Sequence, residues 1–200
     1  MKTSIKTLIA TSLTAIVLST AVFSTRVSAS EIHPLTISAV GNFKKVSVKG
    51  NVEVILIQRA NNGVAYAEDN AGTAKIMHDG DVLRITSTDR TTAKVIVYVT
   101  DIYRIEAAEN AVVKTEGKLN SKYLQIFLKG NAHAEINTTT EGLYTVIQDN
   151  ADLKLSGSTD NHTLVMGNTQ KLTIDKFAAL KTNISSIEIS AVGKEIASIN

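Results

Sequence analysis

Two pairs of side chains in this sequence could carry chemistry. His133 and Asp152 occupy the same position in two similar segments, NAHAEI and NADLKL, so we expect them to lie side by side on neighbouring strands. A histidine beside a carboxylate suits general-base catalysis or metal binding. Neither a third ligand nor a nucleophile falls at a matching position. We therefore favour an exposed cross-strand pair, which contributes roughly 0.2–1 kcal/mol.

The second pair, Tyr123 and Tyr144, falls on outward positions of adjacent segments, whereas Tyr103 falls on an inward one. Exposed aromatic rings on a β surface can stack against sugar rings, although two tyrosines can also pair simply to cover a sheet. Tyr123, Tyr144, His133 and Asp152 together form the predicted binding face. We assign no catalytic residue, metal ligand or cofactor.

Other motifs give weaker signals. The acidic residues Glu141, Asp149 and Asp160 could offer oxygen ligands to calcium, but their spacing matches neither an EF-hand nor a nonapeptide calcium repeat. The run Thr138, Thr139 and Thr140 suggests ice binding, which needs a threonine row that neighbouring segments lack. The sequence also has no nucleophile elbow, zinc-protease motif, phosphate loop or cysteine. A non-enzyme is therefore favoured, and a polysaccharide lyase or hydrolase on a β-helix scaffold is the alternative.

A repeat of about twenty residues supplies the positions used above. An asparagine followed by alternating apolar residues recurs at Asn51, Asn110, Asn131 and Asn150. The fold class predicted from this period is all-β, a single-stranded right-handed β-helix or β-solenoid with coils of about twenty residues and irregular N-terminal coils. Each asparagine could join a ladder of side-chain amides, but its expected outward position favours a left-handed turn position instead; ligand binding by the row of asparagines is the less favoured alternative. Glycines at 117, 142 and 157 are expected to mark a second turn in each coil.

The repeat also predicts which side chains are buried. The inner column is expected to contain Val113, Ala134 and Leu153, and the outer column Lys114, Glu135 and Lys154. The interval 64–103 does not follow the register and is the predicted irregularity. The final segment, 185–200, keeps the alternation without the asparagine, as expected for a cap.

The beginning of the chain has the composition of a signal peptide. Residues 1–29 combine two lysines, an apolar stretch and a small-residue cleavage site, which leaves 30–200 as one domain. Without Lys2, Lys6 and Arg26 the 21 basic residues fall to 18 against 19 acidic ones, and this near-neutral balance disfavours nucleic-acid binding. No membrane span is expected after cleavage. The predicted location is the periplasm, the outer-membrane surface or the medium.

Several segments together resemble one family of exported bacterial proteins, the head-GIN or putative auto-transporter adhesin family. The segments are FKKVSVKGNVEVILIQ, HDGDVLRITS, VIVYVTDIYRIEAAENAVV, GNAHAEI and DNADLKL. Where the family tends to carry Gly and Ser at the repeated bend, this chain carries Asn-Ala. The resemblance implies a β-helical fold, an envelope or surface location and an adhesive role, with no active site. We therefore expect a structural or adhesive module that contacts a glycan or an envelope protein, and unpaired strand edges make homo-oligomers an additional expectation.

Overall fold

Alternation of apolar and polar residues dictates the secondary structure of this chain. The computed structural model describes residues 38–167 and 170–186, which form fourteen strands and no helix. These residues belong to one compact unit, 32–200. The predicted signal peptide and nearly all of the predicted C-terminal cap lie outside the described residues.

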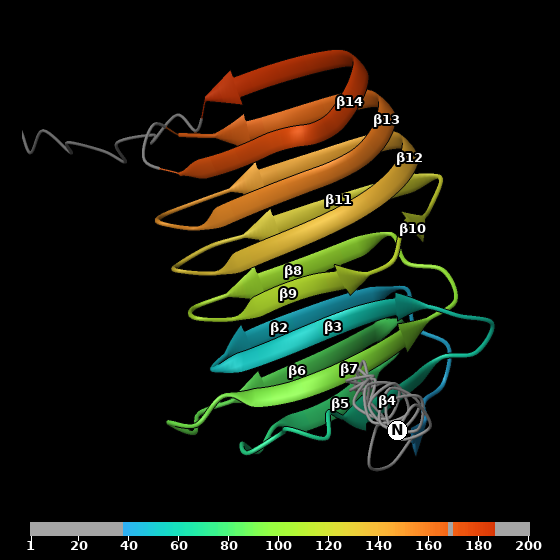
Figure 1. Cartoon of the computed structure of the whole chain (residues 1–200), viewed down its shortest axis with the longest axis vertical. Helices are drawn as coiled ribbons and strands as arrows, with labels where there is room; N and C mark the ends of the chain where they lie inside the picture. The colour runs from blue at the N-terminus through green and yellow to red at the C-terminus, as the bar shows by residue number, and fades with distance from the viewer. Residues whose placement is uncertain (1–37, 168–169, 187–200) are drawn as a thin grey trace, which may run out of the picture. The chain divides into compact units, whose positions relative to one another are not determined.

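All fourteen strands belong to one hydrogen-bonded sheet (Figure 1). In chain order they are β1 (Ser38–Ala39), β2 (Lys45–Gly50), β3 (Val52–Gln58), β4 (Gly63–Tyr66), β5 (Lys75–Asp79), β6 (Val82–Ser87), β7 (Ala93–Val99), β8 (Arg104–Ala108), β9 (Val112–Glu116), β10 (Leu119–Asn120), β11 (Tyr123–Leu128), β12 (His133–Ile147), β13 (Asp152–Met166) and β14 (Lys171–Ser186). One parallel ladder runs through β7, β3 and β9 into the first halves of β12 to β14. A second ladder runs through β6, β2, β8 and β11 into their second halves.

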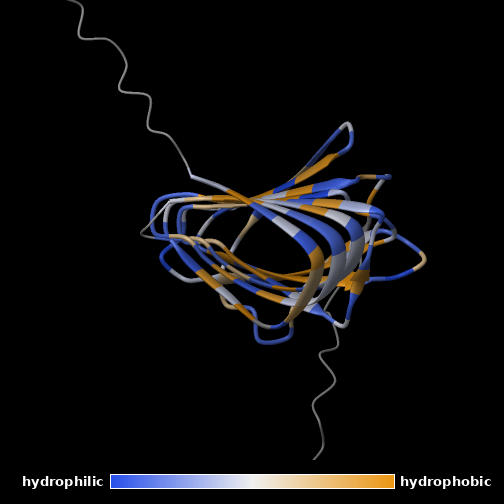
Figure 2. Ribbon diagram, turned by 90° about the horizontal axis from the view of Figure 1, so that it is seen from above, coloured by the Kyte–Doolittle hydropathy of each residue, from blue (hydrophilic) through white to orange (hydrophobic). Residues whose placement is uncertain are grey.

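Long strands join the two ladders. The first residues of β12, His133 to Glu135, pair with β9, whereas Gly142 to Ile147 pair with β11. Seen from above, the sheet curls so that the two ladders face each other and meet where the long strands bend (Figure 2). The path of paired strands from β1 to β5 does not close on itself. The sheet is therefore an open half-barrel with mixed strand directions.

This arrangement confirms the all-β prediction and shows that the predicted right-handed β-helix is wrong. Three strand pairs of the described sheet, β1·β4, β4·β7 and β5·β6, are antiparallel. In addition, β2 lies between β6 and β8, and β3 lies between β7 and β9, although both precede these neighbours in the chain. A regular β-helix adds each coil beside the preceding one. The antiparallel strands β4 and β5 lie mainly within the interval 64–103 that was expected to be irregular.

The predicted columns are confirmed. Val113, Ala134 and Leu153 are partners on successive strands, and each has 0% exposed surface. Lys114, Glu135 and Lys154 are partners in the next row, on the outside of the sheet. The core between the ladders is thus built from one set of alternate side chains, because successive residues of a strand point to opposite faces.

The predicted second turn is wrong at two of its three glycines. Gly117 follows β9 with a φ of 77°, but Gly142 and Gly157 lie inside β12 and β13. The chain bends there without leaving the sheet. Gly157 has a φ of 101°, and a Cβ atom added to it would lie 2.0 Å from the backbone oxygen of Thr138 on the neighbouring strand. Glycine at this position therefore permits close stacking of the two bends.

Three of the four repeated asparagines form an amide ladder, the role that their expected outward position argued against, whereas Asn51 donates to the backbone oxygen of Arg90 and accepts a hydrogen bond from Oγ1 of Thr92. Nδ2 of Asn131 donates to Oδ1 of Asn110 at 3.3 Å, and Nδ2 of Asn150 donates to Oδ1 of Asn131 at 3.4 Å. The left-handed conformation belongs instead to the residue before each asparagine. These preceding residues are Gly50, Glu109, Gly130 and Asp149.

Candidate functional site

The outer surface of the first ladder carries a row of opposite charges, which we call the charged face (Glu53, Lys114, His133, Glu135, Asp152 and Lys154). Nζ of Lys114 lies 2.8 Å from Oε1 of Glu53, and Nζ of Lys154 lies 3.4 Å from Oε2 of Glu135. A hydrogen bond from His133, assisted by Lys154, holds the pKa of the Glu135 carboxyl below its usual range. Most of the charge on this face is therefore neutralised within the protein.

His133 lies between two carboxylates. Its Nδ1 is 3.1 Å from Oδ2 of Asp152, and its Nε2 is 3.3 Å from Oε1 of Glu135. In a hydrolytic triad the second ring nitrogen faces the hydroxyl of a nucleophile. Here that nitrogen faces an acid, so the arrangement ties β12 to β13 and offers no base to a substrate. The described residues also contain no group of three or more His, Cys, Asp or Glu side chains placed to hold a metal ion.

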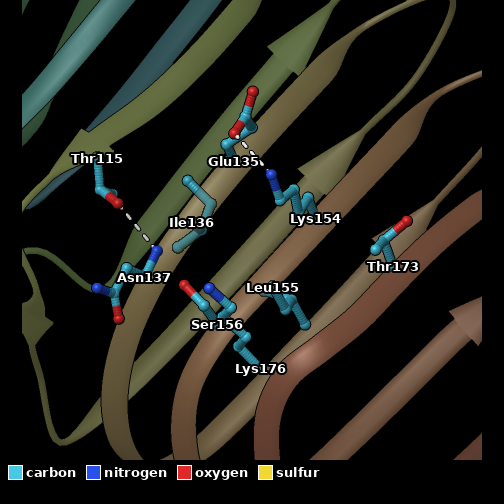
Figure 3. Close-up of a pocket in the computed structure, with 9 residues that line it drawn as sticks. All are labelled: Thr115, Glu135, Ile136, Asn137, Lys154, Leu155, Ser156, Thr173 and Lys176. Carbon is cyan, nitrogen blue, oxygen red and sulfur yellow. Dashed lines mark hydrogen bonds and ion pairs between the residues drawn. The ribbon is translucent and has the colours of Figure 1, made fainter.

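A hollow of about 430 Å³ adjoins the charged face near the bend (Figure 3). Its lining residues are Thr115, Glu135, Ile136, Asn137, Lys154, Leu155, Ser156, Thr173 and Lys176. The Lys154 side chain points toward Glu135, and the backbone N–H of Asn137 donates to Oγ1 of Thr115 at 2.9 Å (Figure 3). The hollow has both polar and apolar walls, several of its polar groups already bond to one another, and no aromatic ring lines it.

The outer surface of the second ladder is different in character, and we call it the aromatic face (Arg104, Tyr123, Gln125, Phe127 and Tyr144). The rings of Phe127 and Tyr144 have centroids 5.8 Å apart and planes at 55°. The guanidinium of Arg104 lies 4.9 Å from the centroid of Phe127, and its Nε donates to Oε1 of Gln125 at 2.8 Å. The face therefore combines exposed ring surface with fixed polar groups.

The structure separates the four predicted site residues into two sets. Tyr123 and Tyr144 lie on the aromatic face, whereas His133 and Asp152 lie on the charged face of the other ladder. Tyr144 is 37% exposed and contacts the ring of Phe127. Tyr123 is 59% exposed, and its ring covers Gly142, where an added Cβ atom would lie 2.9 Å from Cδ1. Tyr123 thus has a structural role as the cover of a glycine.

Two further aromatic side chains differ from expectation. Tyr103, predicted to point inward, is only partly buried, and its hydroxyl donates to Oδ2 of the exposed Asp81 at 3.0 Å. Phe127 was not singled out from the sequence. Its outward position in LQIFL was nevertheless a usable signal, because Ile126 and Leu128 on either side are buried.

A second hollow, of about 370 Å³, lies beside Phe127 on the aromatic side of the sheet. We call it the Phe127 hollow. The residues that line it are Ser47, Val48, Lys49, Glu106, Ala107, Ala108, Phe127, Leu128, Lys129, Val146 and Gln148. It combines one aromatic wall with lysine, glutamate, serine and glutamine side chains.

The structure gives little support to the calcium and ice-binding sites suggested by the sequence. Glu141 and Asp160 line the same open hollow, whereas Asp149 lies at a different turn, between β12 and β13. Thr138 and Thr140 are buried and donate hydrogen bonds to the backbone oxygen of Leu119 and to Oγ1 of Thr159. Two of the three threonines in this run therefore serve the core and do not present a row to the surface.

The fold and its outer faces define an all-β protein built on one curled, mixed sheet that displays exposed side chains on both ladders. The sequence profile of the family described as "Putative auto-transporter adhesin, head GIN domain" matches residues 42–196, and the chain belongs to this family. Family membership points to an adhesive role without catalysis. No curated protein matches the chain.

Solved structures share the fold. A crystal structure described as a putative adhesin from Parabacteroides distasonis is 12% identical, with 76% of each chain covered and a TM-score of 0.58. A putative adhesin from Parabacteroides merdae is 13% identical, again with 76% of each chain covered and a TM-score of 0.55. A structure described as a putative lipid binding protein from Parabacteroides distasonis is 8% identical over 76% of this chain and 77% of that one, with a TM-score of 0.56. At these identities the likeness shows the fold alone.

Proposed function

We propose that this protein is a non-enzymatic adhesive module of the bacterial cell envelope that binds glycans through its aromatic face. The observation that carries the proposal is the group of exposed rings beside hydrogen-bonding side chains on one ladder. Phe127 and Tyr144 present ring surface to which the C–H groups of a sugar can pack, and Gln125 and Arg104 lie next to them. The family's adhesive role supports the same conclusion.

The charged face is the less suitable of the two outer faces. Its lysines and acids pair with one another, so a ligand would have to replace contacts that already exist. On the aromatic face a ligand displaces water from the exposed part of Tyr144, and at Tyr123 it competes with Lys122, whose Nζ lies 5.5 Å from the ring centroid. Burial of ring surface is then a net gain in free energy.

The proposal also includes export of the protein from the cytoplasm. The predicted signal peptide and the family's adhesive role support the proposal that the protein is exported, to the periplasm, the outer-membrane surface or the medium. Within the part of the chain that the structure describes, no helix combines the length and apolar character needed to cross a bilayer. An envelope glycan, or a protein that carries one, would be within reach at each of these locations.

The test is a glycan array followed by calorimetry on protein produced from the full chain. Tyr144→Ala should weaken glycan binding roughly three- to tenfold, since a contact with one ring contributes about 0.5–1.5 kcal/mol. The double substitution Tyr123→Ala/Tyr144→Ala should weaken it further. The matched control is His133→Ala/Asp152→Ala on the charged face, which should leave affinity unchanged.

Equal affinity of the wild type and the double tyrosine variant would refute the aromatic face as the binding surface. Release of reducing sugar or unsaturated products from a polysaccharide panel would instead support the carbohydrate-active enzyme alternative. Thermal unfolding of each variant separates lost contacts from lost folding, which matters most at Tyr123 because its ring covers Gly142.

A further inference from the structure

We propose that the Phe127 hollow is a subsite for an acidic sugar residue, a hexuronate, within the glycan that the protein binds. This inference rests on the proposed function and adds the chemical class of the ligand. It follows from three features of the hollow: a small floor, one aromatic wall and a lysine that makes no ion pair with any described residue.

The floor is Ala108. The register of β2 and β8 places Lys49 beside Ala108. On the other side of β8, Leu128 is the partner of Ala107, and the backbone N–H of Lys129 donates to the oxygen of Ala107 at 3.1 Å. Lys129 is therefore the second neighbour of Ala108. A one-carbon side chain therefore lies between two long ones on the outer surface. This difference in size creates the depression, because neighbouring side chains of a sheet stand roughly perpendicular to it.

The aromatic wall is the side chain of Phe127. Phe127 is the register partner of Glu106, which lies between Arg104 and Ala108 on the same outer face of β8. Arg104 and Tyr144 both contact the ring, and the Phe127 side chain also lines the hollow. The ring is therefore held in place by two neighbours, and the part of it that lines the hollow can contact a sugar.

Charge decides which sugar fits. Glu106 pairs with Arg104 at 3.3 Å and Lys49 pairs with Glu109 at 3.1 Å, whereas Lys129 has no ion pair within the described residues. The lining thus contains one uncompensated positive charge. A carboxylate held beside the Phe127 ring would pair with Lys129, and the side chains of Ser47 and Gln148 offer hydrogen bonds to sugar hydroxyls.

The experiment compares uronate polymers with their own neutral derivatives. Calorimetry measures binding of polygalacturonate, alginate and hyaluronan, each before and after chemical reduction of its carboxyl groups. We expect at least one native polymer to bind roughly tenfold tighter than its reduced form, with the difference shrinking as salt is raised. Lys129→Gln should remove this preference. Lys118→Gln, which removes an exposed lysine from the turn after β9, should leave it intact.

A second variant tests the hollow without changing any charge. Ala108→Leu fills the floor from the solvent side and should lower uronate binding about as much as Lys129→Gln, with thermal unfolding as the check on folding. The subsite is refuted if native and reduced polymers bind equally, if none of the uronates binds, or if both variants keep the preference. Binding of neutral glycans that depends on Tyr144 would then leave the proposed function standing. Absence of binding to every glycan would refute both.

Discussion

The bend in β13 gives the sharpest test of the architecture, through the substitution Gly157→Ala. Gly157 lies opposite Thr138 on β12 and has a φ of 101°. An added Cβ atom would lie 2.0 Å from the oxygen and 2.9 Å from the carbonyl carbon of Thr138. The obstacle is backbone, so no side-chain rotation can relieve the contact.

The expected loss of stability has two parts. A backbone conformation this unfavourable for an L-residue costs about 1–3 kcal/mol, and forcing extra volume into a packed position costs about 1–3 kcal/mol more. The sum, about 2–6 kcal/mol, is a large part of the 5–15 kcal/mol that usually stabilises a domain. Gly157→Ala should therefore lower the denaturation midpoint strongly.

The matched control is Gly117→Ala. Gly117 also has a positive φ, 77°, but an added Cβ atom would meet nothing within 4 Å. Only the left-handed penalty of about 1–2 kcal/mol applies there. Equilibrium urea denaturation followed by far-UV circular dichroism measures both variants. Equal destabilisation, or a smaller effect at Gly157, would refute the close stacking of the bends.

Three further predictions concern stability. Glu109→Gly should stabilise the protein by about 0.5 kcal/mol in urea denaturation. The substitution relieves a φ of 62° and removes only an exposed ion pair with Lys49. A destabilised variant would contradict this prediction. Burial lowers the pKa of His162 in the folded protein, so below about pH 6.5 the unfolded chain binds more protons than the folded one and the free energy of unfolding should fall. His162→Gln should flatten this pH dependence in unfolding midpoints measured between pH 7.5 and 5. Leu153→Ala should cost about 2–5 kcal/mol, whereas Lys154→Ala should cost less than about 1 kcal/mol; similar values would refute the inner and outer columns.

Local alternation made much of this structure predictable. The period of two residues fixes which side chains are buried, and the spacing of 19 to 21 residues fixes which strands become neighbours in the second half of the chain. Val113, Ala134 and Leu153 therefore meet as expected. The neighbour of His133 on the next strand, Asp152, was predicted from this register, whereas its contact with Glu135, two residues away on the same face, was not.

The periodicity of the sequence does not determine the order of the strands in the first half of the chain. Placing β2 between β6 and β8 depends on pairing Lys45 with Val82 and with Arg104, which lie 37 and 59 residues further along the chain, and several such orders are compatible with the same alternation. The direction of β4 and β5 depends in turn on short connections such as the two residues between β5 and β6, where Gly80 has a φ of 59°. A repeat detected in the second half could not supply this information.

The unpredicted strand order is also what builds the proposed subsite. In a sheet that added its strands in chain order, β6 would separate β2 from β8. The outer neighbour of Ala108 would then come from β6, at the position of Thr86, which is the partner of Lys49 on its other side. The observed order instead brings Lys49 directly to Ala108 and completes the rim of the Phe127 hollow. Ala108→Leu therefore tests the sheet order as well as the ligand class. A leucine at position 108 should weaken glycan binding only if side chains of β2 and β11 enclose that position.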